Sequence, residues 1–361
     1  MKIVIDRRER LVRKAVQAFN LELHPFCVLT EAATGHFMLT PLIAAIGGAR
    51  MVYALARDSK YGSAAQVAHA TRALAHDWGV ASHVQVLEHR DDPRLEEADI
   101  VTNLGAVRPI DAALLDRLSP RVAVALMWET WEFRAQDLDL DLCRRRGIPV
   151  LGTDEGHADL RIFGYLPQVA IRLLHELGIE VFRSTVAVVG SGPFADETCR
   201  GLAAAGAVPT PISPLLLREA PSRVTLASAD AILFVEHHER RVLVGDGGVL
   251  AADELHEINP AAVVAHICGG VNERDLDRVG LRHAPAAFAP PGFMSVSTAY
   301  VGPRPVIDLH AAGLRVGQAL AQARGLGLSG LEAERWALAN CSYAQGFDDR
   351  HHPPPCGRRN E

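Results

Sequence analysis

Side chains that can transfer protons, act as nucleophiles or bind metals gather where two apolar runs of the sequence end. Glu236, His237 and His238 follow one run, and His266 and Cys268 follow the other, directly before a glycine pair. A histidine transfers protons near neutral pH, and a cysteine thiolate is a nucleophile. We therefore expect catalytic residues among His266, His237, His238 and Glu236.

Other interpretations of the same residues remain open. Cys268 is also compatible with a small residue that packs against a cofactor. His237 or His238 is also compatible with a solvated loop residue, because residues 237–248 (HHERRVLVGDGG) resemble an exposed hairpin. A catalytic zinc needs three protein ligands, and neither helical i, i+4 spacing nor a C-x-x-C pair occurs here. We expect no metal.

The elements that hold these residues are predicted by an alternation of short apolar runs with helical patterns. The expected strands are residues 26–30, 50–56, 83–89, 99–103 and 122–128 in a first series, and 184–192, 207–213, 230–236 and 261–267 in a second. Long helices are expected over 157–181, 305–325 and 328–340. This alternation is typical of parallel sheets covered on both faces. We expect an α/β fold with two Rossmann/flavodoxin-like doubly wound parallel-sheet domains and a cleft between them.

The expected domains follow from these two series. A flavodoxin-like substrate domain comprises residues 1–157 plus 295–330, because the late long helix can return to the first series. A dinucleotide-binding Rossmann domain comprises residues 158–294. Residues 331–361 contain a C-terminal helix and a loose, proline-rich tail.

A glycine motif at the start of the second series points to a nucleotide. Gly190, Gly192 and Ala195 match G-x-G-x-x-G/A between an apolar strand and a helix. In such a turn the glycines allow close approach of a diphosphate, which the N–H groups of the helix start then bind. The expected cofactor-binding residues are Gly190, Ser191, Gly192, Pro193, Phe194, Ala195, Ser213 and Cys268. A ligand-free glycine turn is the alternative.

The choice between NAD and NADP depends on the end of the next strand. An acidic residue is expected there to hold the ribose hydroxyls, but the chain has Ser213 followed by Pro214. Ser213 with Arg218 is suited to a 2′-phosphate, which favours NADP over NAD, although Arg218 is also compatible with a solvated side chain.

Composition excludes several classes of partner. The 361 residues carry a formal net charge of −6 with no basic stripe, so nucleic acid is not expected. No uncharged run approaches the ~20 residues of a membrane span. The start of the chain has no signal-peptide pattern, and the six cysteines are scattered. We expect a cytoplasmic protein that acts on a small molecule.

Residues 98–156, which contain the run RGIPV, together with residues 184–276, resemble the NAD(P)-dependent D-isomer 2-hydroxyacid dehydrogenases. The chain is similar to a divergent, formate/glycerate dehydrogenase-like member. The resemblance implies two domains with a nicotinamide cofactor in the second, and a homodimer. It also places Cys268 where the family has a substrate-binding arginine, and residues 289–303 contain no counterpart of its catalytic histidine. The usual 2-hydroxyacid chemistry is therefore not expected.

A loop of the first domain supplies candidate substrate contacts. Trp128, Glu129 and Glu132 follow an expected strand, and Arg304 precedes the late long helix. Two tryptophans and two glutamates in this loop favour a substrate with an amine or cationic group, whereas a surface loop with an interfacial tryptophan is the alternative. The sequence thus predicts an NAD(P)-dependent oxidoreductase. Alternatives are an enzyme that keeps NAD bound and uses it transiently, as S-adenosylhomocysteine hydrolase does, and a non-catalytic nucleotide-binding protein.

Overall fold

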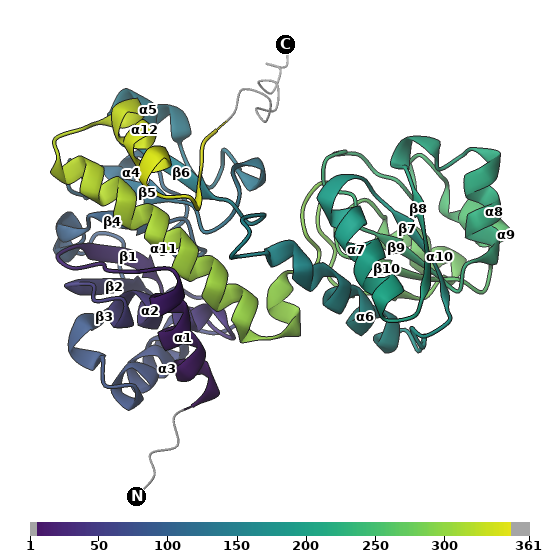
Figure 1. The fold of residues 1–361 in the computed structure, drawn as a ribbon, viewed down its shortest axis with the longest axis horizontal. Coiled ribbons are helices and arrows are strands. Elements are labelled where there is room, and N and C mark those ends of the chain that lie inside the picture. Colours follow the sequence, from purple (N-terminus) through teal and green to yellow (C-terminus); the bar gives the residue numbers. More distant parts are fainter. Residues whose placement is uncertain (1–5, 348–361) are drawn as a thin grey trace, which may run out of the picture. The chain divides into compact units, whose positions relative to one another are not determined.

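The computed structural model describes residues 6–347, which form two compact units (Figure 1). Unit 1 comprises the chain up to Leu160 together with the chain from Pro303 on, and unit 2 comprises Arg161–Gly302. Each unit contains one sheet dominated by parallel strands with helices on both faces, so the expected α/β fold is confirmed. The tail expected after the last helix lies outside the described residues.

Within residues 6–347, the sheet of unit 1 has seven strands in the order β12-β6-β5-β4-β1-β2-β3. Its strands are β1 (Cys27–Glu31), β2 (Met51–Leu55), β3 (Val84–Leu87), β4 (Ile100–Thr102), β5 (Ala123–Ala125), β6 (Val150–Thr153) and β12 (Ala344–Gln345). All pair in parallel except β12, which is antiparallel to β6. Since β2 and β3 lie on one side of β1 and β4 to β6 on the other, the chain reverses its direction of winding between β1 and β4.

Helices cover both faces of this sheet because successive strand side chains alternate between the faces. The helices of unit 1 are α1 (Arg7–Ala18), α2 (Thr40–Ile46), α3 (Ala64–Asp77), α4 (Ala112–Leu115), α5 (Leu140–Arg145), α11 (Pro303–Gly325) and α12 (Gly330–Asn340). Tyr53 and Leu55 of β2 belong to one apolar core with α4 and α5. Ala54, between them, belongs instead to a cluster with Val67 of α3.

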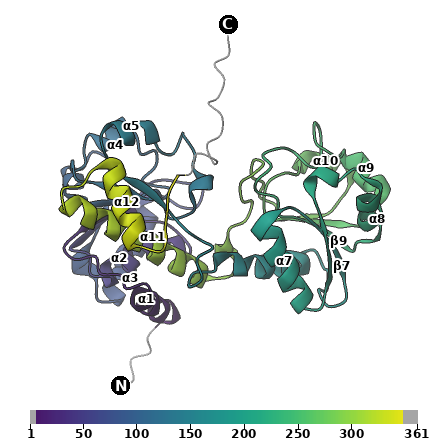
Figure 2. The ribbon, with the colours of Figure 1, turned by 45° about the horizontal axis from the view of Figure 1, so that its top comes forward.

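The long helix α11 lies across the strands of unit 1, as Figure 1 shows. Its Gly317 permits this approach, because a Cβ there would lie 2.6 Å from Cγ2 of Ile100. Helix α12 packs beside α11 (Figure 2) and buries Ala333 and Ala337. The C-terminal helix that we assigned to a separate segment, residues 331–361, thus packs within unit 1, and β12 extends its sheet.

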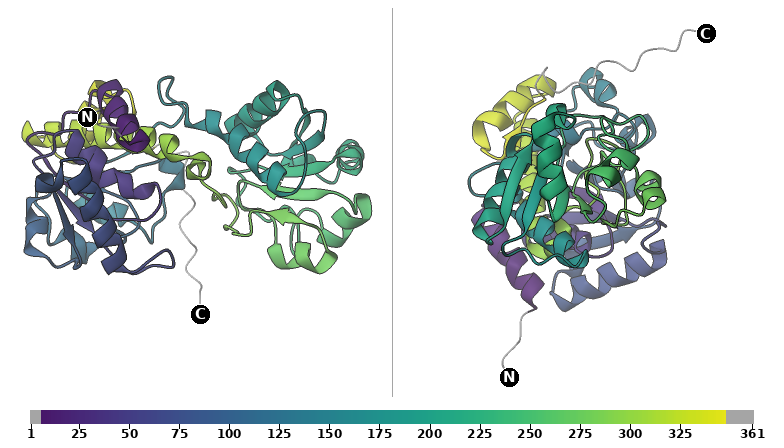
Figure 3. Two further views of the ribbon diagram at one scale, coloured as in Figure 1. Left: turned by 90° about the horizontal axis from the view of Figure 1, so that it is seen from below. Right: turned by 90° about the vertical axis from the view of Figure 1, so that its right-hand side faces the viewer.

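The sheet of unit 2 has five parallel strands in the order β11-β10-β9-β7-β8. Its strands are β7 (Thr185–Val189), β8 (Val208–Ile212), β9 (Ala231–Phe234), β10 (Val263–His266) and β11 (His283–Ala284), and its helices are α6 (Leu166–Glu176), α7 (Gly192–Ala204), α8 (Ala220–Ser228), α9 (Ala252–Ile258) and α10 (Glu273–Val279). Helix α7 lies on one side of β7 and β9, and α8 to α10 lie on the other (Figure 2). Figure 3 shows this layering in two further views.

One helix boundary and one alternative from the sequence need correction in unit 2. The helix expected over 157–181 begins only at Leu166, after a 3-10 turn, because Pro167 lacks an N–H and suits the first turn of a helix. Residues 237–248, whose resemblance to an exposed hairpin supported the alternative of a solvated His237 or His238, contain no named strand, although His238 is exposed. Leu243 and Val244 are instead buried in the core of unit 2.

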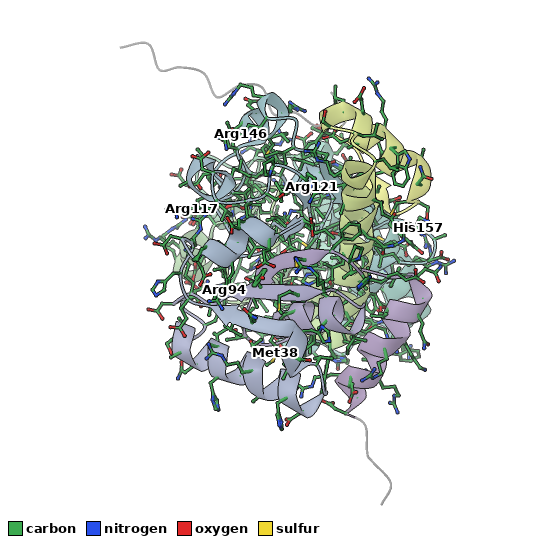
Figure 4. The ribbon with its side chains drawn as sticks, turned by 90° about the vertical axis from the view of Figure 1, so that its left-hand side faces the viewer. Met38, Arg94, Arg117, Arg121, Arg146 and His157 are labelled. Atoms are coloured by element: carbon green, nitrogen blue, oxygen red, sulfur yellow. The ribbon has the colours of Figure 1, made fainter. Side chains whose placement is uncertain are left out.

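Some of the arginines on the surface of unit 1 have acidic partners. Figure 4 shows the labelled Arg94, Arg117, Arg121 and Arg146 spread over one side of this unit. Arg94 pairs with Asp92 at 2.6 Å, and Arg146 pairs with Asp116 at 2.7 Å. These two arginines therefore stand beside acidic partners and do not belong to an unbroken basic stripe. Between residues 6 and 347, no helix has the length and apolar character needed to span a bilayer.

Candidate functional site

The glycine motif forms the turn from β7 into α7. A Cβ on Gly190 would lie 2.7 Å from Cγ2 of Val235, so the first glycine lets β7 and the end of β9 approach closely. Gly192 has φ +62°, a conformation that L side chains rarely adopt. It is also the first residue of α7, which has no side-chain cap. The turn therefore has the backbone shape and the helix start that bind diphosphates.

A buried carboxylate ties this turn to the end of β9. Ser191 donates its hydroxyl to Oε2 of Glu236 at 2.7 Å. The backbone N–H groups of His238 and Glu239 donate to Oε1 of Glu236 at 2.6 and 2.9 Å. Glu236 is only 1% exposed. These contacts indicate that Glu236 positions the turn, whereas we had expected it to take part in proton transfer.

The two histidines after Glu236 lie against the same turn. The ring of His237 stacks on Phe194 with centroids 3.9 Å apart, and the ring of His238 is 3.8 Å from that of His237. Burial, reinforced by His238, lowers the pKa of His237 to about 4, so it is neutral at pH 7. His238 is exposed, and its Nε2 lies 3.0 Å from where a Cβ on Gly192 would stand. Its imidazole thus lies beside the glycine turn.

His266 is held inside unit 2 by both ring nitrogens. Its Nε2 lies 3.0 Å from the carbonyl oxygen of Pro285, and its Nδ1 lies 3.0 Å from Oγ of Ser295. Since a carbonyl only accepts, Nε2 carries the hydrogen and Nδ1 accepts from the Ser295 hydroxyl. Burial lowers the pKa of His266 to about 4, and the residue is fully buried. These contacts describe a structural histidine and lend no support to an acid–base role.

The first glycine of the pair after Cys268 is explained by packing within unit 2. A Cβ on Gly269 would lie 2.1 Å from the carbonyl oxygen of Ala289 and 2.3 Å from that of Pro290. The chain around Pro290 therefore lies directly on Gly269. Cys268 is fully buried beside this contact. Its burial does not favour a nucleophile, and the cofactor contact that we expected for Cys268 finds no exposed surface on its side chain.

Of the remaining residues of the expected cofactor site, some are buried and one is exposed. Phe194 and Ala195 are 2% and 4% exposed and pack α7 against its surroundings. Ser213 is exposed and follows β8, the edge strand of the sheet. No acidic residue stands at that strand end. The residues of the turn therefore fit the diphosphate of a dinucleotide, while a carboxylate for the ribose hydroxyls is missing from the end of β8.

Unit 1 contains a cavity of about 390 Å³ at the carboxyl ends of its strands. It is lined by residues that follow or end β1, β2, β4 and β5, among them Glu31, Phe37, Arg57, Tyr61, Arg108 and Trp128. The cavity thus lies beside the reversal of winding between β1 and β4, where open α/β sheets bind ligands. Its volume is within the range of small-molecule sites.

Glu31 was not predicted from the sequence, and neither were Arg57 and Arg108 of the same cavity. Glu31 ends β1, is 8% exposed, and accepts a hydrogen bond from the N–H of Ala106 at 3.0 Å. Burial raises the pKa of Glu31, against the opposing effects of the Ala106 N–H and the Arg108 guanidinium. A glutamate directly after the apolar run of residues 26–30 was a signal that could have identified it.

Two arginines of the cavity are held in place by other groups. Nη1 of Arg57 donates to the carbonyl oxygen of Arg108 at 2.9 Å. Nη1 of Arg108 donates to Asp137 at 2.6 Å, and its guanidinium lies over the ring of Trp128 at 5.4 Å from the centroid. Such anchoring pre-organises the cations for an anionic group.

The predicted substrate residues are only partly brought together. Trp128 lines the cavity, and Glu129 beside it accepts from Nε1 of Trp131 at 2.6 Å. Burial, reinforced by Glu129 and opposed by Arg134, raises the pKa of Glu132 to about 7. Arg304, by contrast, is exposed in the first turn of α11 and does not line the cavity.

A third carboxylate lies near the glutamates of this loop. Burial first, then the charges of Glu132 and Glu129, raise the pKa of Glu155, which follows β6. The grouping of Glu129, Glu132 and Glu155 therefore favours the protonated form of these carboxyl groups, or the presence of a cation beside them. Within residues 6–347, no group of three or more His, Cys, Asp or Glu side chains is arranged to hold a metal.

Several solved structures share the fold of this chain. A dipicolinate synthase chain from Bacillus halodurans is 12% identical over 81% of this chain and 98% of its own, with a TM-score of 0.53. A dipicolinate synthase chain from Bacillus subtilis is 12% identical over 84% and 99%, with a TM-score of 0.54. A Ralstonia solanacearum protein assigned as a D-3-phosphoglycerate dehydrogenase is 11% identical over 87% and 99%, with a TM-score of 0.50.

No protein-family model matches the chain, and a search of curated proteins found no match. At these identities the structural similarities establish a shared fold. The fold implied by the resemblance to the D-isomer 2-hydroxyacid dehydrogenases is thereby confirmed.

Proposed function

We propose that this protein is an NAD(P)-dependent oxidoreductase whose small-molecule substrate is not a standard 2-hydroxy acid. The observation that carries the proposal is the turn from β7 into α7, with its left-handed Gly192 and uncapped helix start. The fold shared with a protein assigned as a dehydrogenase supports the same function. We expect this enzyme to be located in the cytoplasm and to form a homodimer. Light scattering after size-exclusion chromatography tests whether it is a homodimer.

In this proposal the residues of unit 2 bind and orient the cofactor. The backbone of the Gly190–Gly192 turn and the N–H groups of α7 hold the diphosphate, and Glu236 fixes the turn through Ser191. The bound nicotinamide supplies hydride transfer. His238, which is exposed beside the turn, is the group best placed to contact a bound dinucleotide. Ser213, with no acidic neighbour at the end of β8, favours NADP over NAD.

The residue Cys268, which follows β10, argues against a substrate whose carboxylate is bound at this position. A guanidinium binds a carboxylate through two parallel hydrogen bonds, and the buried thiol of Cys268 cannot do so. The cavity of unit 1, with Arg57 and Arg108, instead offers groups that bind an anionic part of a substrate.

A second candidate is a protein that binds the nucleotide tightly without net redox turnover. The full burial of His266 and Cys268 favours it, because neither of these reactive side chains reaches solvent. This candidate has two versions. In the first the protein is an enzyme that uses the bound cofactor transiently, and in the second it is a non-catalytic protein that only binds the nucleotide.

Titration of the purified protein with NADH and with NADPH, followed by fluorescence, tests the proposal. We expect saturable binding, tighter for NADPH. Absence of binding for both contradicts it, provided that acid extraction shows no nucleotide already bound. Nucleotide that co-purifies in stoichiometric amount, with no oxidation of added substrates, favours the second candidate.

A further inference from the structure

The cavity of unit 1 contains a buried carboxylate that has no cationic partner. Glu31 is 8% exposed. Among the residues that the structure describes, its interactions come from backbone N–H groups of Gly105 and Ala106 and from the more distant charge of Arg108, without an ion pair. Burying a charge without pairing it is costly. A carboxylate also accepts about four hydrogen bonds, so Glu31 retains capacity for a donor supplied by a ligand.

The opposite charge stands on other residues of the same cavity. Arg57 lines the cavity and is anchored by the carbonyl oxygen of Arg108 at 2.9 Å, yet it pairs with no carboxylate of the described residues. Arg108 shares its charge with Asp137 at 2.6 Å. The cavity therefore combines one buried acceptor with one unpaired and one shared guanidinium.

The walls between these charges are apolar and aromatic. Phe37, Tyr61, Trp128 and Leu104 line the cavity together with small alanine residues. A volume of about 390 Å³ accommodates a molecule with a modest side chain. A phosphate ester fits this lining poorly, because its double negative charge would stand near the Glu31 carboxylate.

We propose that this cavity binds a small amino-acid-type zwitterion, with its ammonium on Glu31, its carboxylate on Arg57 and Arg108, and its side chain against Trp128. An ammonium is favoured over a hydroxyl because it supplies the positive charge that a buried carboxylate needs. The inference rests on the proposed function only in naming this ligand as the substrate; binding itself does not require the cofactor.

Isothermal titration calorimetry of the full chain, without cofactor, tests the inference. The twenty standard L-amino acids are screened by thermal shift, and the best binder is compared with its analogue lacking the ammonium, its 2-hydroxy analogue and its decarboxylated amine. We expect the amino acid to bind at least tenfold more tightly than each of the three. Absence of any binding amino acid, or equal affinity for the 2-hydroxy analogue, overturns the inference.

Substitutions assign the contacts. Glu31→Gln is expected to lower the affinity for the amino acid at least tenfold and to leave the affinity for the analogue without the ammonium nearly unchanged. Arg57→Met is expected to lower the affinity for both of these ligands and to leave the affinity for the decarboxylated amine unchanged. Glu96→Gln, on an exposed glutamate that does not line the cavity, serves as the matched control. If Glu31→Gln fails to fold, the Arg57→Met pattern decides, and equal loss for all ligands overturns the assignment.

The outcomes separate this inference from the proposed function. Amino acid binding without NADH or NADPH binding leaves the inference standing and contradicts the oxidoreductase. Binding of NADH or NADPH without amino acid binding contradicts the inference and leaves the proposed oxidoreductase standing.

Discussion

Ser191 and Glu236 join two elements of unit 2 through a hydrogen bond of 2.7 Å from the serine hydroxyl to the glutamate carboxylate. Ser191 belongs to the turn between β7 and α7, and Glu236 follows β9. Because Glu236 also accepts from the N–H groups of His238 and Glu239, the glycine turn and the loop after β9 form one hydrogen-bonded structure. Bonds to a carboxylate are stronger than those between neutral groups.

A double-mutant cycle measures this link. Ser191→Ala leaves Oε2 of Glu236 without its donor, and we expect a loss of about 1–3 kcal/mol in the free energy of unfolding. Glu236→Gln removes the charge that all three donors share. In urea unfolding, the two substitutions together are expected to cost less than the sum of their separate effects by about 1 kcal/mol. Strict additivity would show that the bond does not hold the turn.

His266 offers a test of a structural role against a catalytic one. His266→Phe removes the partners of the Ser295 hydroxyl and the Pro285 carbonyl, so we expect a destabilisation of about 2–4 kcal/mol. Nucleotide affinity, measured on the folded fraction, should change less than threefold. A variant of wild-type stability that has lost all turnover would instead assign His266 to the reaction.

His237 predicts an acid-sensitive part of the stability. Its pKa is about 4 in the folded protein and about 6.5 in an unfolded chain, so the unfolded state binds more protons between these values. Stability is therefore lost as pH falls from about 6.5 to about 4. His237→Phe keeps a ring on Phe194 and should remove up to about 3 kcal/mol of this pH dependence. Parallel curves for both proteins in urea unfolding would contradict the lowered pKa.

Glu132 predicts the opposite pH dependence in unit 1. Its pKa is about 7 when folded and about 4.3 when unfolded, so the folded state binds the extra proton. Its contribution to stability is present at low pH and is lost as pH rises from about 4.5 to about 7. Relative to wild type, Glu132→Gln should therefore gain up to about 3 kcal/mol between pH 5 and pH 8. Glu96→Gln, which is exposed, should show no such gain.

The fold was largely predictable because the strands of both sheets are short, apolar and bounded by turns. The runs 26–30 and 184–192 became β1 and β7 with shifts of a residue or a few, and the glycine motif fell between strand and helix as expected. What failed depended on tertiary contacts. The segment that contains Leu243 and Val244 resembles an exposed hairpin in sequence, and only its packing into the core of unit 2 shows that these two residues are buried.

The candidate site was less predictable than the fold. His266 and Cys268 stand at a strand end where reactive groups are common, and no sequence pattern reveals that Pro285 and Ser295 engage both nitrogens of His266. Glu31 was missed for the reverse reason. A single glutamate after an apolar run is unremarkable until the loops after β2 and β4 bring Arg57 and Arg108 to the same cavity.

Calorimetric titration of NADPH into the wild type, Gly192→Ala and Gly178→Ala tests the central claim most directly. Both glycines have positive φ angles, +62° at Gly192 and +78° at Gly178, but a Cβ at Gly178 meets nothing within 4 Å, whereas at Gly192 it meets His238. Both variants share a backbone strain of about 1 kcal/mol, so only Gly192→Ala alters the proposed diphosphate site. We predict that Gly192→Ala weakens NADPH at least tenfold while Gly178→Ala binds as the wild type does. Equal affinity in all three proteins, or no binding to a nucleotide-free wild type, would contradict the account.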